Sequence, residues 1–412
     1  MRRFAASSIL ALALTEIALA DTVHDDRLAI STFATGLKEP VAIEFAPDGR
    51  LFIAEVGGKV RVASADGVVD PAPVASIEVF TANENGLLGL ALDPDFATNG
   101  YIYVFATIDP KEQQILRMID PAKRQSEADA QPFVLRDHLP TRGEFHSGGG
   151  LEIGPDKKLY FGIGDNLVRE NSQDMNTLAG KISRINLDGT TPSDNPFKTA
   201  SGSPRAVYAL GLRNPFRFCF APDGRLFAMD VGSDNEERRE EINLIRPGDN
   251  CGWPLFEGKQ SEPIDPAYVD PIFDYHDGGA APVGCVFYTG DGLPEEYVGI
   301  LFHLEFVLGR LYRTVLDGDT VINHTTLLES EGGPVDLTVG PDGALYYSEL
   351  YTGEIKRLGP PATSVAGNGV SEPSVDADSS TDEVVQPASL CGFGAWLSSL
   401  AVVGLAARRG RV

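Results

Sequence analysis

Residues 45–52 read Phe45-Ala46-Pro47-Asp48-Gly49-Arg50-Leu51-Phe52, and this stretch decides the fold because it recurs along the chain. Proline presets one backbone angle of a turn, aspartate hydrogen-bonds to the nearby backbone, and glycine supplies a left-handed position. Short apolar or aromatic runs flank each copy, which is the pattern of a β-hairpin. The other copies are Asp93-Pro94-Asp95-Phe96, Gly154-Pro155-Asp156-Lys157-Lys158-Leu159-Tyr160, Phe220-Ala221-Pro222-Asp223-Gly224-Arg225-Leu226-Phe227 and Gly340-Pro341-Asp342-Gly343-Ala344-Leu345-Tyr346.

The spacing of these copies predicts about six units, each long enough for a four-stranded sheet. The interval between Pro222 and Pro341 is about twice the others, and strand-like runs at 283–288 and 300–312 fill it without the turn signature. Alternating apolar and polar residues at 60–62 and 182–185 indicate outer strands. Long helical periodicity is absent between residues 28 and 358. The sequence therefore predicts an all-β fold, a six-bladed β-propeller over residues 21–359.

The composition fits one large β domain and argues against a nucleic-acid partner. The chain has 412 residues, of which 42% are hydrophobic, so a large core is available. Its formal net charge of −25 opposes binding to a phosphate backbone, which needs a basic surface. An acidic surface is compatible with calcium and with an extracellular medium.

Both ends of the chain carry targeting signals. Residues 1–20 combine Met1-Arg2-Arg3, an apolar stretch and Ala18-Leu19-Ala20, which indicates a secretory signal peptide. Residues 360–389 are rich in Ser, Pro, Asp and Glu and are expected to form a disordered linker. Residues 390–412 hold an apolar run, 390–407, followed by arginines, and resemble C-terminal sorting segments of some Gram-negative bacteria; a plain membrane anchor is the alternative. We therefore expect an exported protein that is periplasmic, displayed on the outer surface or secreted, with permanent or transient membrane attachment.

Three of the four cysteines lie in the predicted propeller: Cys219, Cys251 and Cys285. An oxidising compartment would allow one bridged pair among them, which the sequence does not select. The chain has no Cys-x-x-Cys spacing, which argues against a zinc or redox cysteine site.

The segment with the strongest chemical signal is Glu144-Phe145-His146-Ser147-Gly148-Gly149-Gly150-Leu151, which directly precedes one turn unit and is followed by Ile163-Gly164-Asp165. A histidine there can reach a shared central cavity, and the glycines let a flat ligand approach the backbone. The alternative for an isolated histidine is a loop residue that caps a turn.

Five collinear segments, covering about residues 30 to 358, resemble the soluble pyrroloquinoline-quinone-dependent sugar dehydrogenases. That group includes bacterial aldose dehydrogenases and the propeller of the animal hedgehog-interacting proteins. The segments are Asn85-Gly86-Leu87-Leu88-Gly89-Leu90-Ala91-Leu92-Asp93-Pro94-Asp95-Phe96, Phe145-His146-Ser147-Gly148-Gly149, Leu178-Ala179-Gly180-Lys181-Ile182-Ser183-Arg184-Ile185, Gly211-Leu212-Arg213-Asn214-Pro215-Phe216-Arg217, and the stretch from Asp230-Val231-Gly232 to Asn250-Cys251-Gly252-Trp253-Pro254.

The resemblance implies the catalytic roles. The histidine at the place of His146 is the general base, which takes the proton of the sugar anomeric hydroxyl while hydride passes to the quinone. Asp165 would hold the imidazole in orientation, or alternatively it caps a turn at a strand end.

The resemblance also implies the ligand-binding residues. Glu84, Asn85, Arg213 and Asn214 fall on cofactor-binding positions, with Arg213 alternatively tying blades together. The backbone carbonyls of Gly232 and Ser233 fall where the family holds a calcium ion against the quinone. The neighbouring acidic run 234–237 is expected to be a solvated loop.

The chain departs from the enzyme pattern at its cationic positions. Glu84 replaces a cofactor-binding glutamine, Val307 stands near the place of a lysine, and Gly333 and Val335 stand near two arginines. Arg310 or Lys356 could compensate. The sequence from Asp230-Val231-Gly232 to Glu240-Glu241-Ile242-Asn243 is more similar to the hedgehog-interacting branch. The animal members of that branch are binding proteins and not enzymes.

Three functions follow. The first, which we favour, is a quinoprotein that oxidises an aldose and passes electrons to a soluble or membrane acceptor. The second is a non-catalytic propeller for surface adhesion or ligand binding. The third is a metal-dependent lactonase-type hydrolase, which needs several acidic or amide side chains around one cation; Glu55, Glu84, Asp165 and Glu349 are the candidates for these ligands. Trp253 is expected to be a packing residue at a blade junction, and His276 to lie at the rim of the cavity.

Overall fold

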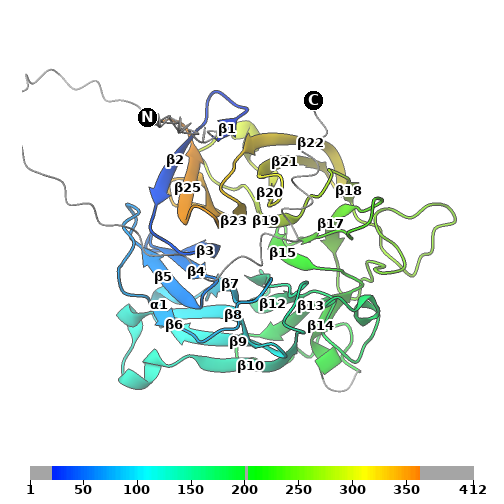
Figure 1. Cartoon of the computed structure of the whole chain (residues 1–412), viewed down its shortest axis with the longest axis horizontal. Coiled ribbons are helices and arrows are strands. Elements are labelled where there is room, and N and C mark those ends of the chain that lie inside the picture. The colour runs from blue at the N-terminus through cyan, green and yellow to red at the C-terminus, as the bar shows by residue number, and fades with distance from the viewer. Residues whose placement is uncertain (1–20, 200–202, 362–412) are drawn as a thin grey trace, which may run out of the picture.

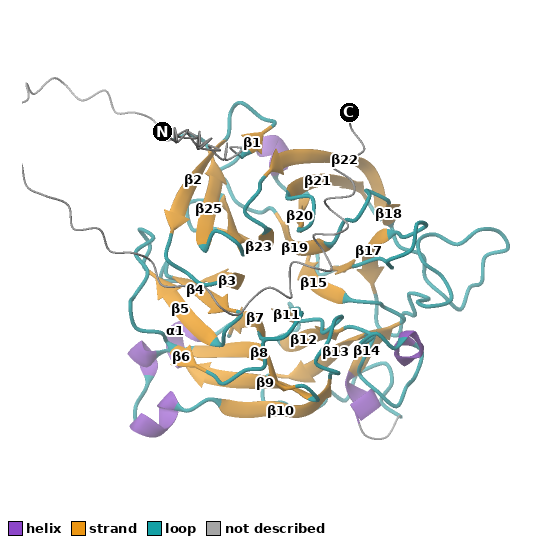
Figure 2. Ribbon diagram, viewed as in Figure 1, coloured by secondary structure: helices purple, strands orange, loops and turns teal. Residues whose placement is uncertain are grey.

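A computed structural model describes residues 21–199 and 203–361, and these residues form the predicted six-bladed β-propeller (Figure 1). Each blade is an antiparallel sheet whose first strand lies nearest the axis. The first strands of neighbouring blades contact one another around the whole ring. Figure 2 shows how little helix the fold contains.

The strands of the first three blades follow the chain in order. Blade one contains β3 (Pro40–Phe45), β4 (Leu51–Glu55), β5 (Lys59–Ala63) and β6 (Ala75–Ser76). Blade two contains β7 (Leu87–Leu92), β8 (Tyr101–Asp109), β9 (Glu112–Ile119) and β10 (Phe133–Pro140). Blade three contains β11 (Leu151–Ile153), β12 (Lys158–Ile163), β13 (Lys181–Asn186) and β14 (Val207–Leu210).

The remaining blades include the N-terminal strands of the domain. Blade four contains β15 (Pro215–Phe220), β16 (Leu226–Asp230), β17 (Glu240–Ile245) and β18 (Phe273–Tyr275). Blade five contains β19 (Pro282–Phe287), β20 (Leu301–Glu305), β21 (Arg310–Asp317) and β22 (Thr320–Glu329), with β1 (Thr22–Val23) added outside β22. Blade six joins β23 (Pro334–Val339), β24 (Leu345–Glu349) and β25 (Glu354–Gly359) to β2 (Ala29–Ala34).

Short helices occupy the connections. They are the α-helix α1 (Phe96–Asn99) and the 3₁₀ helices η1 (Pro121–Lys123), η2 (Glu127–Ala130), η3 (Arg169–Ser172), η4 (Ser203–Ala206) and η5 (Glu295–Tyr297).

The recurrent turn joins the first and second strands in five of the six blades, as predicted. In blade one Gly49 takes a φ of 87° and its N–H donates to the Ala46 carbonyl, 2.9 Å away, which closes the turn. Glycine adopts that angle without the clash that a Cβ would cause. Blade five has instead a longer connection that holds η5 between β19 and β20. This accounts for the wide interval in the sequence pattern.

One arginine ties the axis together. Arg217 of β15 is 5% exposed, and its Nη2 donates to the carbonyls of Val41 on β3 (2.6 Å) and Leu88 on β7 (2.8 Å). Its Nε lies 3.3 Å from a carboxylate oxygen of Asp336 on β23. Arg217 therefore connects the inner strands of four blades.

Arg217 also separates two cavities along the inner strands. A cavity of about 350 Å³ lies toward the start of these strands and is described below. A second cavity of about 220 Å³ lies farther along the same strands, and its walls include Arg217 and the carboxyl groups of Glu44, Glu152 and Asp336.

The structure bears on the prediction about the cysteines, whereas the predicted terminal segments lie outside the residues that it describes. Cys219, Cys251 and Cys285 are all buried and free, so the expected bridged pair is absent from the structure. The signal peptide, the segment 390–412 and the linker beyond residue 361 lie outside the described residues. Within the described ranges, no helix is both long and apolar enough to cross a membrane.

Candidate active site

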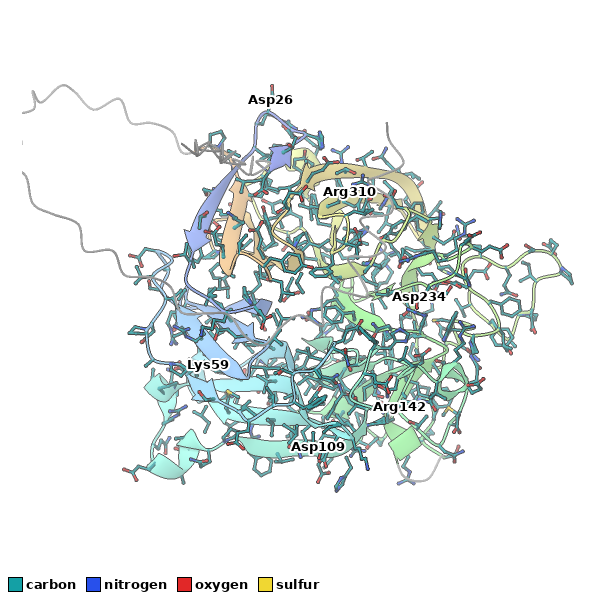
Figure 3. The ribbon with its side chains drawn as sticks, in the orientation of Figure 1. Asp26, Lys59, Asp109, Arg142, Asp234 and Arg310 are labelled. Atoms are coloured by element: carbon teal, nitrogen blue, oxygen red, sulfur yellow. The ribbon has the colours of Figure 1, made fainter. Side chains whose placement is uncertain are left out.

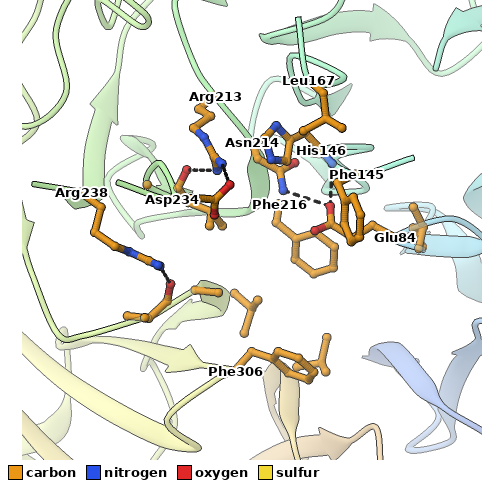
Figure 4. A pocket seen from close by; sticks show the side chains of 18 of the residues that line it. Glu84, Phe145, His146, Leu167, Arg213, Asn214, Phe216, Asp234, Arg238 and Phe306 are labelled. Atoms are coloured by element: carbon orange, nitrogen blue, oxygen red, sulfur yellow. Dashed lines mark hydrogen bonds and ion pairs between the residues drawn. The ribbon is translucent and has the colours of Figure 1, made fainter. Parts of the chain in front are cut away.

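The larger cavity brings together most of the predicted site residues (Figure 4). Glu84, His146, Arg213, Asn214 and Gly232 all line it. Asp165 stands directly behind His146, and Asn85 and Ser233 are buried next to the residues that line the wall. The rest of the wall is mainly apolar: Val41, Leu88, Phe145, Leu167, Phe216, Ala280, Ala281, Val283, Phe306, Val335 and Leu350.

His146 is held in place at its backbone and its ring. It precedes β11 with a φ of 61°, and its N–H donates to Glu84 Oε2 at 2.8 Å. Its Nδ1 lies 2.6 Å from Asp165 Oδ1. A Cβ on Gly164 would stand 2.3 Å from the His146 carbonyl oxygen, so glycine is needed for the two segments to approach. Gly164 thus lets the segment after β12 pack against the backbone of His146.

Asp165, directly after β12, plays both roles that the sequence left open. Its Oδ1 accepts from the Leu167 N–H at 2.8 Å, which caps the turn, as well as facing His146. Its Oδ2 accepts from the indole N–H of Trp253 at 2.9 Å. Burial would raise the pKa of Asp165, but the hydrogen bonds from His146 and Trp253 outweigh it, and the pKa lies below its ordinary value.

An ionised Asp165 fixes the state of the imidazole. A carboxylate only accepts hydrogen bonds, so the proton of a neutral His146 ring sits on Nδ1. Nε2 is then the nitrogen with a free lone pair, and it belongs to a ring that lines the cavity. The pair is therefore arranged to accept a proton from a ligand.

Asn214 links the two sides of the site. Its side-chain amide donates to Glu84 Oε2 at 3.3 Å and accepts from the Gly148 N–H at 3.2 Å. The N–H groups of Arg213 and Asn214 both donate to Asp230, at 2.9 and 2.6 Å. Burial raises the pKa of Asp230 to about 7.

Asn85 has a framework role in this structure. Its amide donates to the carbonyls of Ala82 (2.6 Å) and Glu144 (2.9 Å), and it accepts from the Ser147 hydroxyl at 3.0 Å. It therefore ties the loop before β7 to the loop that carries His146.

Two arginines supply positive charge to the cavity. Arg213 Nη1 donates to the Val231 carbonyl at 3.0 Å, and Nη2 lies 3.5 Å from Asp234, whose side chain is 91% exposed. Arg238 pairs with Glu240 at 2.6 Å and donates to the Ala280 carbonyl. Arg238 was not predicted as a site residue, because it directly follows the acidic loop 234–237, which is exposed as expected.

The cations expected to compensate for missing ones lie elsewhere. Arg310 pairs with Asp277 on the outer part of blade five, and Lys356 pairs with Glu354 in blade six (Figure 3 labels Arg310). Neither is among the residues that line the cavity. Val335, which stands near a family arginine, does line it and adds apolar surface. The structure therefore gives no support to compensation by Arg310 or Lys356.

The residues predicted to bind calcium, Gly232 and Ser233, pack closely against neighbouring segments. A Cβ on Gly232 would stand 2.4 Å from the Arg239 carbonyl oxygen, so only glycine fits. The N–H and hydroxyl of Ser233 both donate to the Glu257 carboxylate, at 2.6 and 2.7 Å. Among the described residues, no group of three or more His, Cys, Asp or Glu side chains is placed to hold a metal ion.

The carboxylates proposed for a hydrolase have separate partners. Glu55 lies 3.4 Å from Arg61. Glu349 accepts hydrogen bonds from the hydroxyls of Ser330 and Thr352. Asp165 is hydrogen-bonded to His146. The expected convergence on one cation is not found. The structure therefore gives no support to the lactonase-type alternative.

Fold and site together define a six-bladed β-propeller with a histidine–aspartate pair at one end of its axis. The model of the family described as glucose/sorbosone dehydrogenase matches residues 37–357. The chain therefore belongs to this family.

Named relatives agree with that assignment. Quinoprotein glucose dehydrogenase B of Acinetobacter calcoaceticus is 33% identical over 55% of this chain and 52% of its own length. An aldose sugar dehydrogenase of Escherichia coli is 27% identical over 79% of this chain and 91% of its own. The structure of a pyrroloquinoline-quinone-bound aldose sugar dehydrogenase from Streptomyces coelicolor has a TM-score of 0.69 and 27% identity, covering 81% of this chain and 98% of its own. The hedgehog-interacting protein of Mus musculus is also similar, with 27% identity over 59% of this chain and 42% of its own length.

Proposed function

We propose that this protein is a quinoprotein oxidoreductase that oxidises an aldose at C1 to the lactone. The observation that carries the proposal is the His146–Asp165 pair, at 2.6 Å, beside a mainly apolar cavity that two arginines also line. The family membership and the quinone-bound structural relative support it.

In this proposal His146 is the general base. Its Nε2 accepts the proton of the anomeric hydroxyl, and Asp165 stabilises the imidazolium that forms. Bound pyrroloquinoline quinone would supply the hydride acceptor for C1. The mainly apolar wall limits the access of water and strengthens the electrostatic interactions inside the site.

The residues of the cavity fit a flat aromatic tricarboxylate. Phe145, Phe216 and Phe306 supply ring surfaces, and Arg213 and Arg238 supply donors for carboxylate or quinone oxygens. Glu84 does not face the cavity as a bare charge, because its Oε2 accepts from His146 N–H and from Asn214. A calcium ion would use the backbone carbonyl oxygens of Gly232 and Ser233, since calcium accepts main-chain oxygen ligands.

Export and electron transfer complete the proposal. The signal-like residues 1–20 and the segment 390–412 support a location outside the cytoplasm, with the latter as a membrane attachment. Electrons would then pass to an acceptor protein or a membrane quinone.

The test is reconstitution of the purified protein with pyrroloquinoline quinone and calcium. We expect saturable quinone binding and reduction of a redox dye that depends on an aldose. His146→Ala should lose at least about 100-fold in kcat, the scale of general base catalysis, and still bind the quinone. His138→Ala is the matched control, because that side chain is 82% exposed on β10.

Absence of quinone binding by the wild-type protein would overturn the proposal. It would favour the non-catalytic binding propeller, to which the likeness to the hedgehog-interacting protein points.

A further inference from the structure

Trp253 reaches the catalytic pair from another blade. It lies in the connection between β17 and β18 of blade four, whereas His146 and Asp165 flank strands of blade three. Its backbone is fixed at both ends, because its N–H donates to the Gly211 carbonyl at 3.0 Å and its carbonyl accepts from the Gln173 amide at 2.7 Å. The residue is 6% exposed.

The only polar atom of the Trp253 side chain is the indole nitrogen, and it forms a hydrogen bond with Asp165. The indole N–H donates to Oδ2, which is the carboxylate oxygen that His146 leaves free, while the Leu167 N–H and His146 share Oδ1. A ring that served packing alone would need no such donor. Without the indole N–H, the buried carboxylate would be held at Oδ1 alone, by His146 and the Leu167 N–H, and its charge would be less dispersed.

The same ring lies next to two arginines, of which Arg213 lines the cavity. The guanidinium carbon of Arg213 lies 5.8 Å from the ring centroid, and that of Arg169 lies 5.3 Å from it. Such contacts are favourable between a cation and an indole face. Trp253 thus borders both the histidine–aspartate pair and a cavity arginine.

We propose that Trp253 is a positioning residue, which holds the Asp165 carboxylate so that His146 keeps its Nε2 lone pair in the cavity. The sequence reading of Trp253 as a packing residue is therefore incomplete. A role of Trp253 in catalysis rests on the proposed function. The hydrogen bonds that connect the indole to the imidazole through Asp165 are present in the protein without any ligand.

The first experiment follows the indole N–H groups by ¹⁵N NMR across pH 5 to 9 in the ligand-free protein. The chain has two tryptophans, so Trp396 gives an internal reference, and Trp253→Phe assigns the signals. We expect the Trp253 signal to move with the same midpoint as the His146 ring signals and to lose that response in His146→Ala. The other charged groups near the pair are Glu84, Arg213 and Asp230. A response that persists in His146→Ala, or no response at all, would overturn the proposal.

The second experiment measures turnover in variants. Trp253→Phe keeps an aromatic side chain, although a smaller one, and loses the donor, so kcat should fall about tenfold or more with little change in KM, and the acidic limb of the pH profile should shift. The loss should vanish when Asp165→Asn is already present, because Trp253 acts through Asp165. Phe256→Leu perturbs packing in the same connection, where Phe256 contacts Tyr268, and should leave kcat unchanged. Equal losses in Trp253→Phe and Phe256→Leu would mean a packing role only.

The two proposals fail separately. If the wild-type protein has no dehydrogenase activity, the proposed function falls and the NMR result still decides the role of Trp253. If activity is present and a folded Trp253→Phe protein retains it in full, only the positioning role falls.

Discussion

Arg238 is the cavity cation that the sequence pattern did not reveal, and its charge can be tested directly. We expect Arg238→Gln to weaken binding of pyrroloquinoline quinone by about tenfold or more, since hydrogen bonds to charged groups contribute about 1.5–3 kcal/mol. The measurement is a quinone titration followed by protein fluorescence. Arg310→Gln is the matched control, because Arg310 pairs with Asp277 away from the cavity wall. Equal affinities for the two variants would rule out a role for Arg238 in binding.

Some residues of the site could be predicted from sequence motifs, whereas others were identified only from the structure. The glycine-rich motif was enough to predict His146, and Arg213 and Asn214 were predicted from their shared motif; all three line the cavity. Trp253 and Arg238 were not predicted as site residues, because each enters from a long connection whose path depends on contacts far away in sequence. The only local signals were Gly252-Trp253-Pro254 and an arginine pair after an acidic run. Such signals are common in loops and select no partner.

At the level of strands, Arg217 is expected to matter more for stability than any surface arginine. Arg217→Met would leave Asp336 without its ion pair and the carbonyls of Val41 and Leu88 without their donor. Breaking a buried charge pair costs about 3–5 kcal/mol, so we expect a loss of about 3 kcal/mol or more in the free energy of unfolding. Guanidinium-induced unfolding measures it.

The control for this prediction is Arg225→Met. Arg225 also makes two ion pairs, with Asp223 and Asp319, but it is 32% exposed. Exposed pairs contribute about 0–1 kcal/mol, so its loss should be small. Similar losses in both variants would contradict the view that the axis depends on Arg217.

The elements were predictable where a turn marks them. The recurrent Pro-Asp turn predicted the first two strands of five blades because it fixes local backbone angles. Blade five lacks the turn and was found only from strand-like runs. The pairing of β2 with β25 was not predicted, since Ile30 and Leu358 are partners in register but more than 300 residues apart.

At the scale of the whole molecule, several acidic groups have a pKa that burial raises, and this predicts how stability depends on pH. Burial raises the pKa of Glu44, Glu241 and Glu305 to about 8. The folded protein therefore holds more protons than the unfolded chain between about pH 4.5 and 8, and its stability falls as pH rises through this range. Burial also lowers the pKa of His324 to about 4, which opposes the trend only below about pH 6.5.

We therefore expect the free energy of unfolding to be lower at pH 8.5 than at pH 6.5. Glu44→Gln should reduce this difference by about 1 kcal/mol or more, because the amide stays neutral where the carboxyl group would ionise. Glu78→Gln on the surface removes the same charge and is the control. A pH dependence identical in both variants would show that Glu44 is not among the groups responsible.

The pairing of β2 with β25 also has a consequence for the order of biosynthesis. The ribosome delivers residues 29–34 early and residues 354–359 near the end of the propeller, so the sixth blade cannot form until almost the whole domain has emerged. Until then β2 has no partner, and the sixth blade consists of β23 and β24 alone. A chain truncated before residue 354 would keep that gap, and the uncovered edges of β24 and β2 would be the surface that a chaperone or protease recognises.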